Sequence, residues 1–167
     1  MSELKDSGTR REFSTGAVRD VADGKGRCDL LPLVQVSEVI GSCTLLQIGM
    51  FMASGRTNHL RNAINEFCEE HGCGLLTAML EVSIHYEDGA RKYAERNWEI
   101  GIPLHCFIDS AVRHYLKWRR GDTDEPHDRA FLWNLLGAWW TLDNHPELND
   151  LPCARKDVYS CKLFSRA

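Results

Sequence analysis

The sequence lacks any long hydrophobic run. No segment of the 167 residues approaches the roughly 18 consecutive apolar residues that a membrane-spanning helix requires. The first residues, MSELKDSGTRREF, contain neither the apolar core nor the cleavage signature of a secretory signal. These absences argue against a membrane protein, and we expect a cytoplasmic location without a membrane partner.

Basic residues are not in excess either. The chain has 20 lysines and arginines against 24 aspartates and glutamates, which gives a formal net charge of −4 and a pI of about 6.0. Such a chain has no general attraction for a polyanion, so a nucleic-acid surface would require a local basic patch. We expect small molecules as partners rather than nucleic acid.

A disulfide framework is also missing. The seven cysteines form an odd set, and nothing in the sequence indicates secretion, so we expect free thiols. Cys68, His71 and Cys73 lie close together, but two cysteines around one histidine at this spacing do not match a structural zinc site. We interpret them as residues that pack a helix.

The sequence does contain enough apolar residues for one core. Hydrophobic residues make up 43% and charged residues 26% of the chain, which excludes a disordered protein. We expect a single domain over residues 16–167, because a chain of this length has no room for two cores. Residues 1–15 are polar and aperiodic, which predicts a mobile tail.

Apolar periodicity predicts an all-α fold, a compact bundle of four to five helices. Residues 16–33 alternate glycines with charged groups and are predicted to be an irregular loop. Residues 34–54 are largely apolar, but Gly41 and Gly49 give a helix there an imperfect register. No strand is convincing, and residues 144–167 are expected to wrap over the bundle. The remaining predicted helices cover Thr57–Gly72, Gly74–Tyr93, Pro103–Arg120 and Glu125–Leu142.

A polar stripe runs along the helix predicted after Gly74. Four side chains at intervals of four, three and four residues lie within about 60° of one another on a helix. The carboxylates and the imidazole could hold a divalent cation, while the lysine offers charge to a phosphate. The alternative, which periodicity alone slightly favours, is a solvated face with helix ion pairs. The four residues are Glu81, His85, Asp88 and Lys92.

A second stripe lies on the next predicted helix. His105, Asp109 and Arg113 follow one another at steps of four, and Asp109 is the best carboxylate ligand on this helix. His114 lies about 140° around the helix from Asp109, so a core or capping role is an even alternative to a role at the same ion.

An acidic turn, GDTDEPHD, precedes the last predicted helix, on which His127, Phe131 and Asn134 share one face. Helix capping and the helix dipole are a sufficient structural explanation for the acids. The pair His127 and Asp128 is similar to the dyad of HD-type phosphohydrolases, although such a site needs further histidines and an aspartate at suitable helical positions.

Aromatic and amide side chains lie between the two polar stripes. Tyr93 and Trp98 could stack on a base, and Asn97 could hydrogen-bond its edge. A tryptophan in a short interhelical turn is also a common packing anchor.

Several segments, in order along the chain, resemble one known family. They are GAVRD, GKGRCDLLP, GARKYAERNWEIGIP, DSAVRHYLKWRRGDTDEPH and AFLWNLL. Together they are similar to the phage domain family called dATP/dGTP diphosphohydrolase, N-terminal, a relative of the MazG-like and MazZ nucleotide pyrophosphohydrolases. The resemblance covers about Gly16–Leu33 and Leu80–Leu142.

The resemblance implies a compact helical fold in which carboxylates on neighbouring helices hold Mg²⁺ or Mn²⁺. A water would attack the α-phosphorus of a purine deoxynucleoside triphosphate and release a monophosphate and pyrophosphate. The resemblance also implies a homo-oligomer, either a dimer or a tetramer, and the cytoplasm of the host cell if a phage encodes the chain.

The resemblance also implies residue roles. The implied catalytic groups are Glu81, Asp109, His114 and His127. Combining these positions with the polar stripes, we hypothesise that Glu81, Asp88 and Asp109 bind the metal, with His85 as a further group. The implied substrate-binding residues are Arg19, Lys25, Arg27, Lys92, Tyr93, Asn97, Trp98, Arg113, Asp124 and Asn134, and Asp20 and Asp29 are further family-like positions.

The chain departs from the related MazG enzymes in its acids. Those enzymes have paired glutamates followed by Glu-x-x-Asp on the next helix, and Asp109 stands without that second motif. Residues 34–73 also lengthen the spacing and could form an oligomer interface or a lid. Two other functions stay open: a protein that sequesters a nucleotide without cleaving it, and an HD-type triphosphohydrolase, centred on His127 and Asp128, that releases triphosphate.

Overall fold

Helices dominate the computed structural model, which describes residues 8–155. This confirms the mostly helical fold, with two corrections. The described part has six α-helices rather than four to five, and it has a two-stranded hairpin where no strand was expected. The elements are β1 (Arg10–Glu12), β2 (Val18–Asp20), η1 (Cys28–Leu30), α1 (Leu33–Ile40), α2 (Cys43–Ser54), α3 (Thr57–His71), α4 (Leu75–Tyr93), η2 (Asn97–Ile100), α5 (Leu104–Arg120), α6 (His127–Asn144), η3 (Pro146–Leu148) and η4 (Pro152–Arg155).

The hairpin falls partly in the predicted tail and partly in the predicted loop. β1 and β2 pair antiparallel, and contacts with the segment after α4 hold them in place. The Thr15 hydroxyl donates to the Gly101 carbonyl at 2.6 Å. The Asn97 amide bonds both backbone groups of Val18, at 2.9 and 2.8 Å. Residues 1–7 of the predicted tail lie outside the described part.

The apolar segment over residues 34–54 forms two helices instead of one. Gly41 ends α1 with φ +64°, a left-handed conformation that glycine adopts without strain. Ser42 then caps α2, because its side chain accepts a hydrogen bond from the Leu45 backbone NH. The glycine that disturbs the apolar register is therefore the break itself.

The later helices lie close to their predicted bounds. Gly72 and Gly121 end α3 and α5 in left-handed conformations with φ +72° and +86°. α6 begins two residues after the predicted start and runs to Asn144. Two short 3₁₀ turns follow it, and the remainder of the predicted C-terminal tail, residues 156–167, lies outside the described part.

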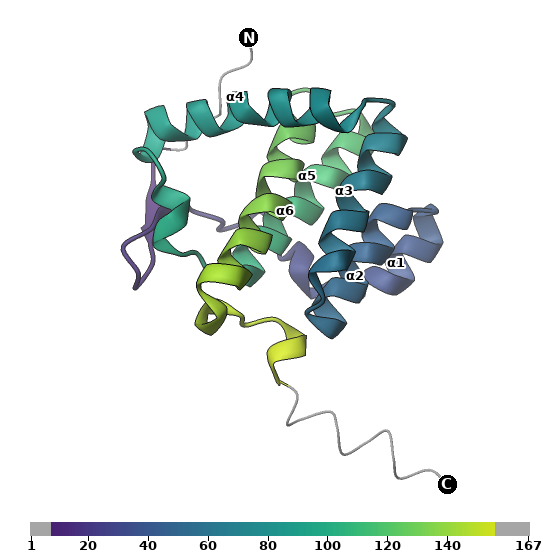
Figure 1. The fold of residues 1–167 in the computed structure, drawn as a ribbon, viewed down its shortest axis with the longest axis horizontal. Helices are drawn as coiled ribbons and strands as arrows, with labels where there is room; N and C mark the ends of the chain where they lie inside the picture. Colours follow the sequence, from purple (N-terminus) through teal and green to yellow (C-terminus); the bar gives the residue numbers. More distant parts are fainter. Residues whose placement is uncertain (1–7, 156–167) are drawn as a thin grey trace, which may run out of the picture.

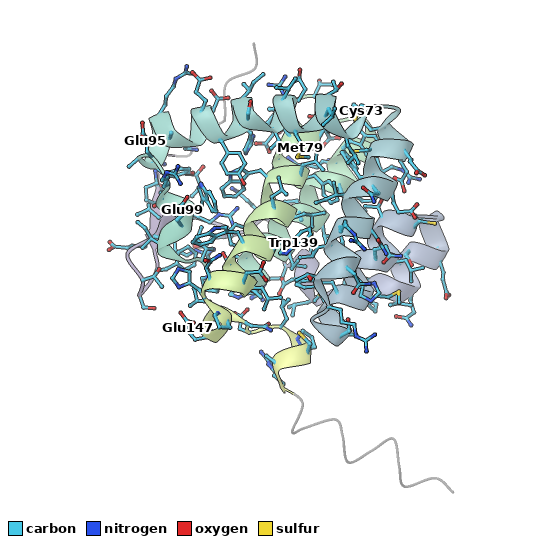
Figure 2. The ribbon with its side chains drawn as sticks, viewed as in Figure 1. Cys73, Met79, Glu95, Glu99, Trp139 and Glu147 are labelled. Carbon is cyan, nitrogen blue, oxygen red and sulfur yellow. The ribbon has the colours of Figure 1, made fainter. Side chains whose placement is uncertain are left out.

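α5 and α6 lie side by side at the centre of the bundle, α2 and α3 flank them, and α4 crosses one end (Figure 1). The interior is aromatic: the Phe67 and Phe131 rings lie 4.5 Å apart, and both are fully buried. Phe107 approaches α6 at Gly137, where an added Cβ would lie 2.5 Å from its ring. Met79 packs on this core from α4 (Figure 2).

Between residues 8 and 155, no helix combines the length and the apolar character needed to span a membrane.

Candidate active site

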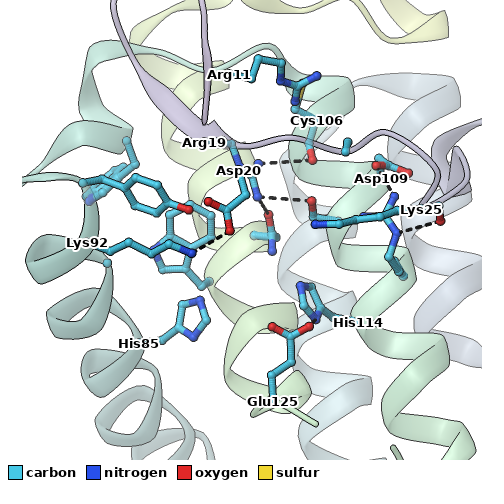
Figure 3. Close-up of a pocket in the computed structure, with 18 of the residues that line it drawn as sticks. Arg11, Arg19, Asp20, Lys25, His85, Lys92, Cys106, Asp109, His114 and Glu125 are labelled. Atoms are coloured by element: carbon cyan, nitrogen blue, oxygen red, sulfur yellow. Dashed lines mark hydrogen bonds and ion pairs between the residues drawn. The ribbon is translucent and has the colours of Figure 1, made fainter. Parts of the chain in front are cut away.

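A cavity of about 860 Å³ opens between α4, α5, α6 and the N-terminal segment that carries β2 and η1 (Figure 3). This volume lies in the range of small-ligand sites in proteins. Besides Asp20, twelve residues with roles predicted from the sequence line the cavity. They are Arg19, Lys25, His85, Lys92, Tyr93, Asn97, Trp98, Asp109, Arg113, His114, Asp124 and Asn134.

Arg19 extends from β2 into the wall of the cavity. Its guanidinium donates to the Cys106 carbonyl at 3.3 Å, to the Ser110 hydroxyl at 3.2 Å and to Asn134 Oδ1 at 3.0 Å. The Phe107 and Trp133 rings lie 5.4 and 5.3 Å from it. Burial lowers the pKa of Arg19 from its ordinary value. Arg19 therefore joins the hairpin to both central helices.

Lys92 reaches the same wall from α4. Its ammonium lies 2.6 Å from Asp20 Oδ2, and Arg10 approaches the other oxygen of Asp20 at 2.9 Å. Burial raises the pKa of Tyr93, and a hydrogen bond to Asp20 raises it further. Asp20 thus organises the cationic and phenolic groups at this end of the cavity.

Asp109 and Arg113 hold the glycine-rich N-terminal loop against α5. They form an ion pair, and Asp109 Oδ1 also accepts a hydrogen bond from the Cys28 backbone NH at 2.7 Å. Arg113 donates to the Gly26 carbonyl at 3.0 Å. Lys25 lines the cavity beside them. Asp109 therefore anchors the N-terminal loop at Cys28 and orients the guanidinium of Arg113.

Two histidines and a glutamate meet at the junction of α5 and α6. The Nδ1 atoms of His114 and His127 lie 3.0 Å apart, and Glu125 Oε1 lies 3.7 and 3.6 Å from them. Behind this histidine–glutamate cluster, Asp124 Oδ1 lies 2.8 Å from His127 Nε2. Lys117 approaches the other Asp124 oxygen at 3.2 Å.

The histidine–glutamate cluster has the geometry and chemistry of a cation site. Ligands bound to one ion at about 2.1 Å are separated by about 3–3.5 Å, close to the observed separations. Burial, followed by the neighbouring His127, lowers the pKa of His114 well below 6.5 and favours the neutral imidazole that binds metals. A carboxylate on the far nitrogen, as Asp124 is on His127, commonly orients a histidine ligand. The residues present therefore fit a divalent cation.

The sequence predicts Glu81, His85, Asp88 and Asp109 as metal ligands, but the structure does not bring these four side chains together at the cavity. Glu81 lies outside the cavity lining, and its carboxylate pairs with Arg129 at 2.5 Å. Asp88 also lies outside the lining and pairs with Arg91 at 3.2 Å. Of the first polar stripe, only His85 and Lys92 face the cavity, because the outer half of α4 is exposed.

Two other sequence expectations fall outside the cavity. Arg27 grips Asp29 through two hydrogen bonds of 2.7 and 2.6 Å and does not line the cavity. Asp128 points to His71, with 3.4 Å between Oδ2 and Nε2, rather than joining His127 in a dyad. The HD-type arrangement is therefore not assembled among the described residues.

Aromatic rings line a further part of the cavity, which we call the aromatic end. The Trp98 ring lies 5.4 Å from Tyr86, which lies 6.0 Å from Trp133. Asn97 sits beside them, but its amide is committed to the backbone of Val18. Its place in the structure is to hold β2 beside the cavity.

Sequence reasoning missed Glu125, Lys117 and Arg120, which also line the cavity. The signal for Glu125 was the acidic turn, which capping alone seemed to explain. The signal for Lys117 was its spacing of four residues from Arg113, which places both on one face of α5.

Cationic, aromatic and histidine–carboxylate side chains thus line one cavity. Residues 74–151 match the family model described as dATP/dGTP diphosphohydrolase, N-terminal. The resemblance predicted from the sequence is confirmed over these residues, which contain α4, α5 and α6. The similar segment around Gly16–Leu33 precedes the matched region. No curated protein and no solved structure matches the chain.

Proposed function

We propose that this protein is a metal-dependent nucleoside triphosphate pyrophosphohydrolase that converts purine deoxynucleoside triphosphates to the monophosphates and pyrophosphate. One observation carries the proposal. A cavity formed largely by the segment that matches the diphosphohydrolase family is lined by His114 and Glu125 of the histidine–glutamate cluster, by several cations and by aromatic rings. These are the parts that cleavage of a nucleotide at a phosphate requires.

In this proposal His114, Glu125 and His127 hold the cation. When bound, a divalent ion supplies charge to the phosphate oxygens and Lewis acidity towards the attacking water. Two imidazoles and one carboxylate suit Mn²⁺ or another transition metal better than Mg²⁺, which prefers oxygen ligands. Asp124 orients His127, which keeps the donor atoms directed at the ion.

The cations of α5 and the N-terminal loop bind the triphosphate. Lys25, Arg113, Lys117 and Arg120 line the cavity, and Lys117 Nζ lies 3.9 Å from Glu125 Oε1 of the histidine–glutamate cluster. Guanidinium groups can engage phosphate oxygens in pairs, while lysines act as point charges. Asp109 keeps Arg113 in place through their ion pair. The aromatic end, with Trp98 and Tyr86, takes the base.

Product analysis tests the reaction. The purified protein is incubated with Mn²⁺ and each of the common nucleoside triphosphates, and the products are separated by ion exchange. We expect deoxynucleoside monophosphate and pyrophosphate from dATP and dGTP. Release of inorganic triphosphate would support the HD-type alternative, and tight binding without any product would support sequestration.

A further inference from the structure

The wall of α4 that faces the cavity contains a glycine that the fold itself does not require. Gly89 lies in the last third of the helix, where glycine lowers helix stability relative to alanine. Its φ is not positive, and an added Cβ would meet no atom within 4 Å. Gly89 and the adjacent Ala90 both line the cavity, so they leave an open surface on α4.

His85 lies one turn before Gly89 on the same face of α4. The residue is only 7% exposed, and its Nδ1 is buried without a hydrogen-bond partner among the described residues. Its ring extends from α4 into the cavity (Figure 3). A buried polar atom without a partner is unfavourable unless a ligand or an ordered water satisfies it.

Three aromatic rings line the same cavity as this open surface. Tyr86 and Trp98 make an edge contact, and Trp133 lies 5.8 Å from the ring of His85. All three line the cavity. The open backbone at Gly89 offers a surface for a planar heterocycle, and the aromatic rings offer faces for stacking. His85 would then be the polar group at the edge of that heterocycle.

We propose that the absence of a side chain at Gly89 leaves space on α4 for a purine base, a space we call the seat, and that His85 donates a hydrogen bond to N7 of that base. The inference rests on the proposed function and names the groups that select its substrate. Adenine and guanine differ in their exocyclic groups, but both present N7 as an acceptor, and pyrimidines have no such atom. A single neutral imidazole N–H can therefore donate the same hydrogen bond to adenine and to guanine.

The hydrogen bond is tested with 7-deaza-dATP, in which a CH group replaces N7. Affinities are measured by titration calorimetry in EDTA, so that no metal-dependent turnover occurs. We expect wild-type protein to bind dATP about tenfold more tightly than the 7-deaza analogue. The His85→Leu variant should bind the two with equal affinity. If the variant keeps the tenfold preference, or if 3-deaza-dATP rather than the 7-deaza analogue loses affinity in wild-type protein, the assignment to N7 is wrong.

The seat is tested with Gly89→Leu, whose side chain would occupy the space left on α4. We expect the affinity for dATP to fall at least about tenfold, while the affinity for inorganic triphosphate stays unchanged. Ser83→Leu adds a similar side chain to the exposed face of the same helix and should bind both ligands like the wild type. Thermal melts establish that each variant is folded.

The outcomes separate the two proposals. Equal dATP binding by wild-type protein and Gly89→Leu would overturn the seat and leave the proposed function standing. Parallel loss of dATP and inorganic triphosphate in Gly89→Leu would also overturn it, because the substitution would then act on the whole cavity. Wild-type protein that binds neither ligand and also yields no product from dATP with Mn²⁺ would remove the proposed function and the seat with it.

Discussion

A substitution at Glu125 tests which residues bind the metal. The structure favours Glu125 with the two histidines, whereas the sequence predicts acids such as Glu81. Glu125→Gln keeps the shape of the side chain but removes the charge beside His114 and His127. We expect turnover to fall by about 100-fold or more. Mn²⁺ should raise the melting temperature of the wild type, because a ligand that binds only the folded state stabilises it, and should not raise that of Glu125→Gln.

The matched control is Glu81→Gln. Glu81 pairs with Arg129 outside the cavity, so this variant should keep the stabilisation by Mn²⁺. The reverse result, with stabilisation lost in Glu81→Gln and kept in Glu125→Gln, would return the metal to the acids expected from the sequence.

The buried histidines predict how stability responds to acid. Burial lowers the pKa of His85 from 6.5 to about 4 and lowers that of His114 well below 6.5. Below pH 6.5 these two histidines are therefore protonated in the unfolded chain but stay neutral in the folded protein. The stability that these neutral side chains contribute is present above pH 6.5 and is lost as the pH falls towards 4.

Urea unfolding at a series of pH values checks this expectation. The free energy of unfolding should fall between about pH 6.5 and 5, before most carboxylates titrate. His85→Leu removes one of the two groups, so its free energy of unfolding should fall less steeply over the same interval. Identical slopes for the two proteins would show that His85 is not held neutral by the fold.

Among the helices, two glycines predict opposite effects of adding a side chain. Gly137 on α6 touches Phe107, and an added Cβ would lie 2.5 Å from the ring, so Gly137→Ala should lower the free energy of unfolding by about 1–3 kcal/mol. Gly89→Ala meets no atom within 4 Å and should raise it by about 0.5–1 kcal/mol. Urea unfolding of both variants gives the comparison, and destabilisation by Gly89→Ala would contradict the open surface on α4.

The elements also show how far sequence patterns reach. Long amphipathic helices such as α3, α4 and α5 carry enough turns for their period to be read, and glycines mark where α3 and α5 end. The hairpin strands have only three residues each, which is too short for an alternating pattern to appear. Their pairing depends instead on distant contacts such as that of Asn97 with Val18.

At the scale of the molecule, sequence spacing located most of the cavity but missed Glu125, which lies beside His114 and His127. Stripes on α4 and α5 show which residues share a face of one helix, and His85, Lys92 and Asp109 do line one cavity. How far each helix is rotated and shifted relative to its neighbours depends on packing across the core. That packing leaves Glu81 outside and brings Glu125 to the histidines.

The match to the family model covers residues 74–151, whereas Arg19 and Lys25 come from the N-terminal segment that lines another part of the cavity. The cavity thus has a helical half that carries the histidine–glutamate cluster and a short half held by Asp109, Arg113 and Asn97. Related chains could exchange the short half and so change how the phosphates are held, while the proposed base-binding and metal-binding groups stay in place. Under the proposed function, part of the phosphate-binding charge and the groups that would perform the chemistry lie on different stretches of the same polypeptide.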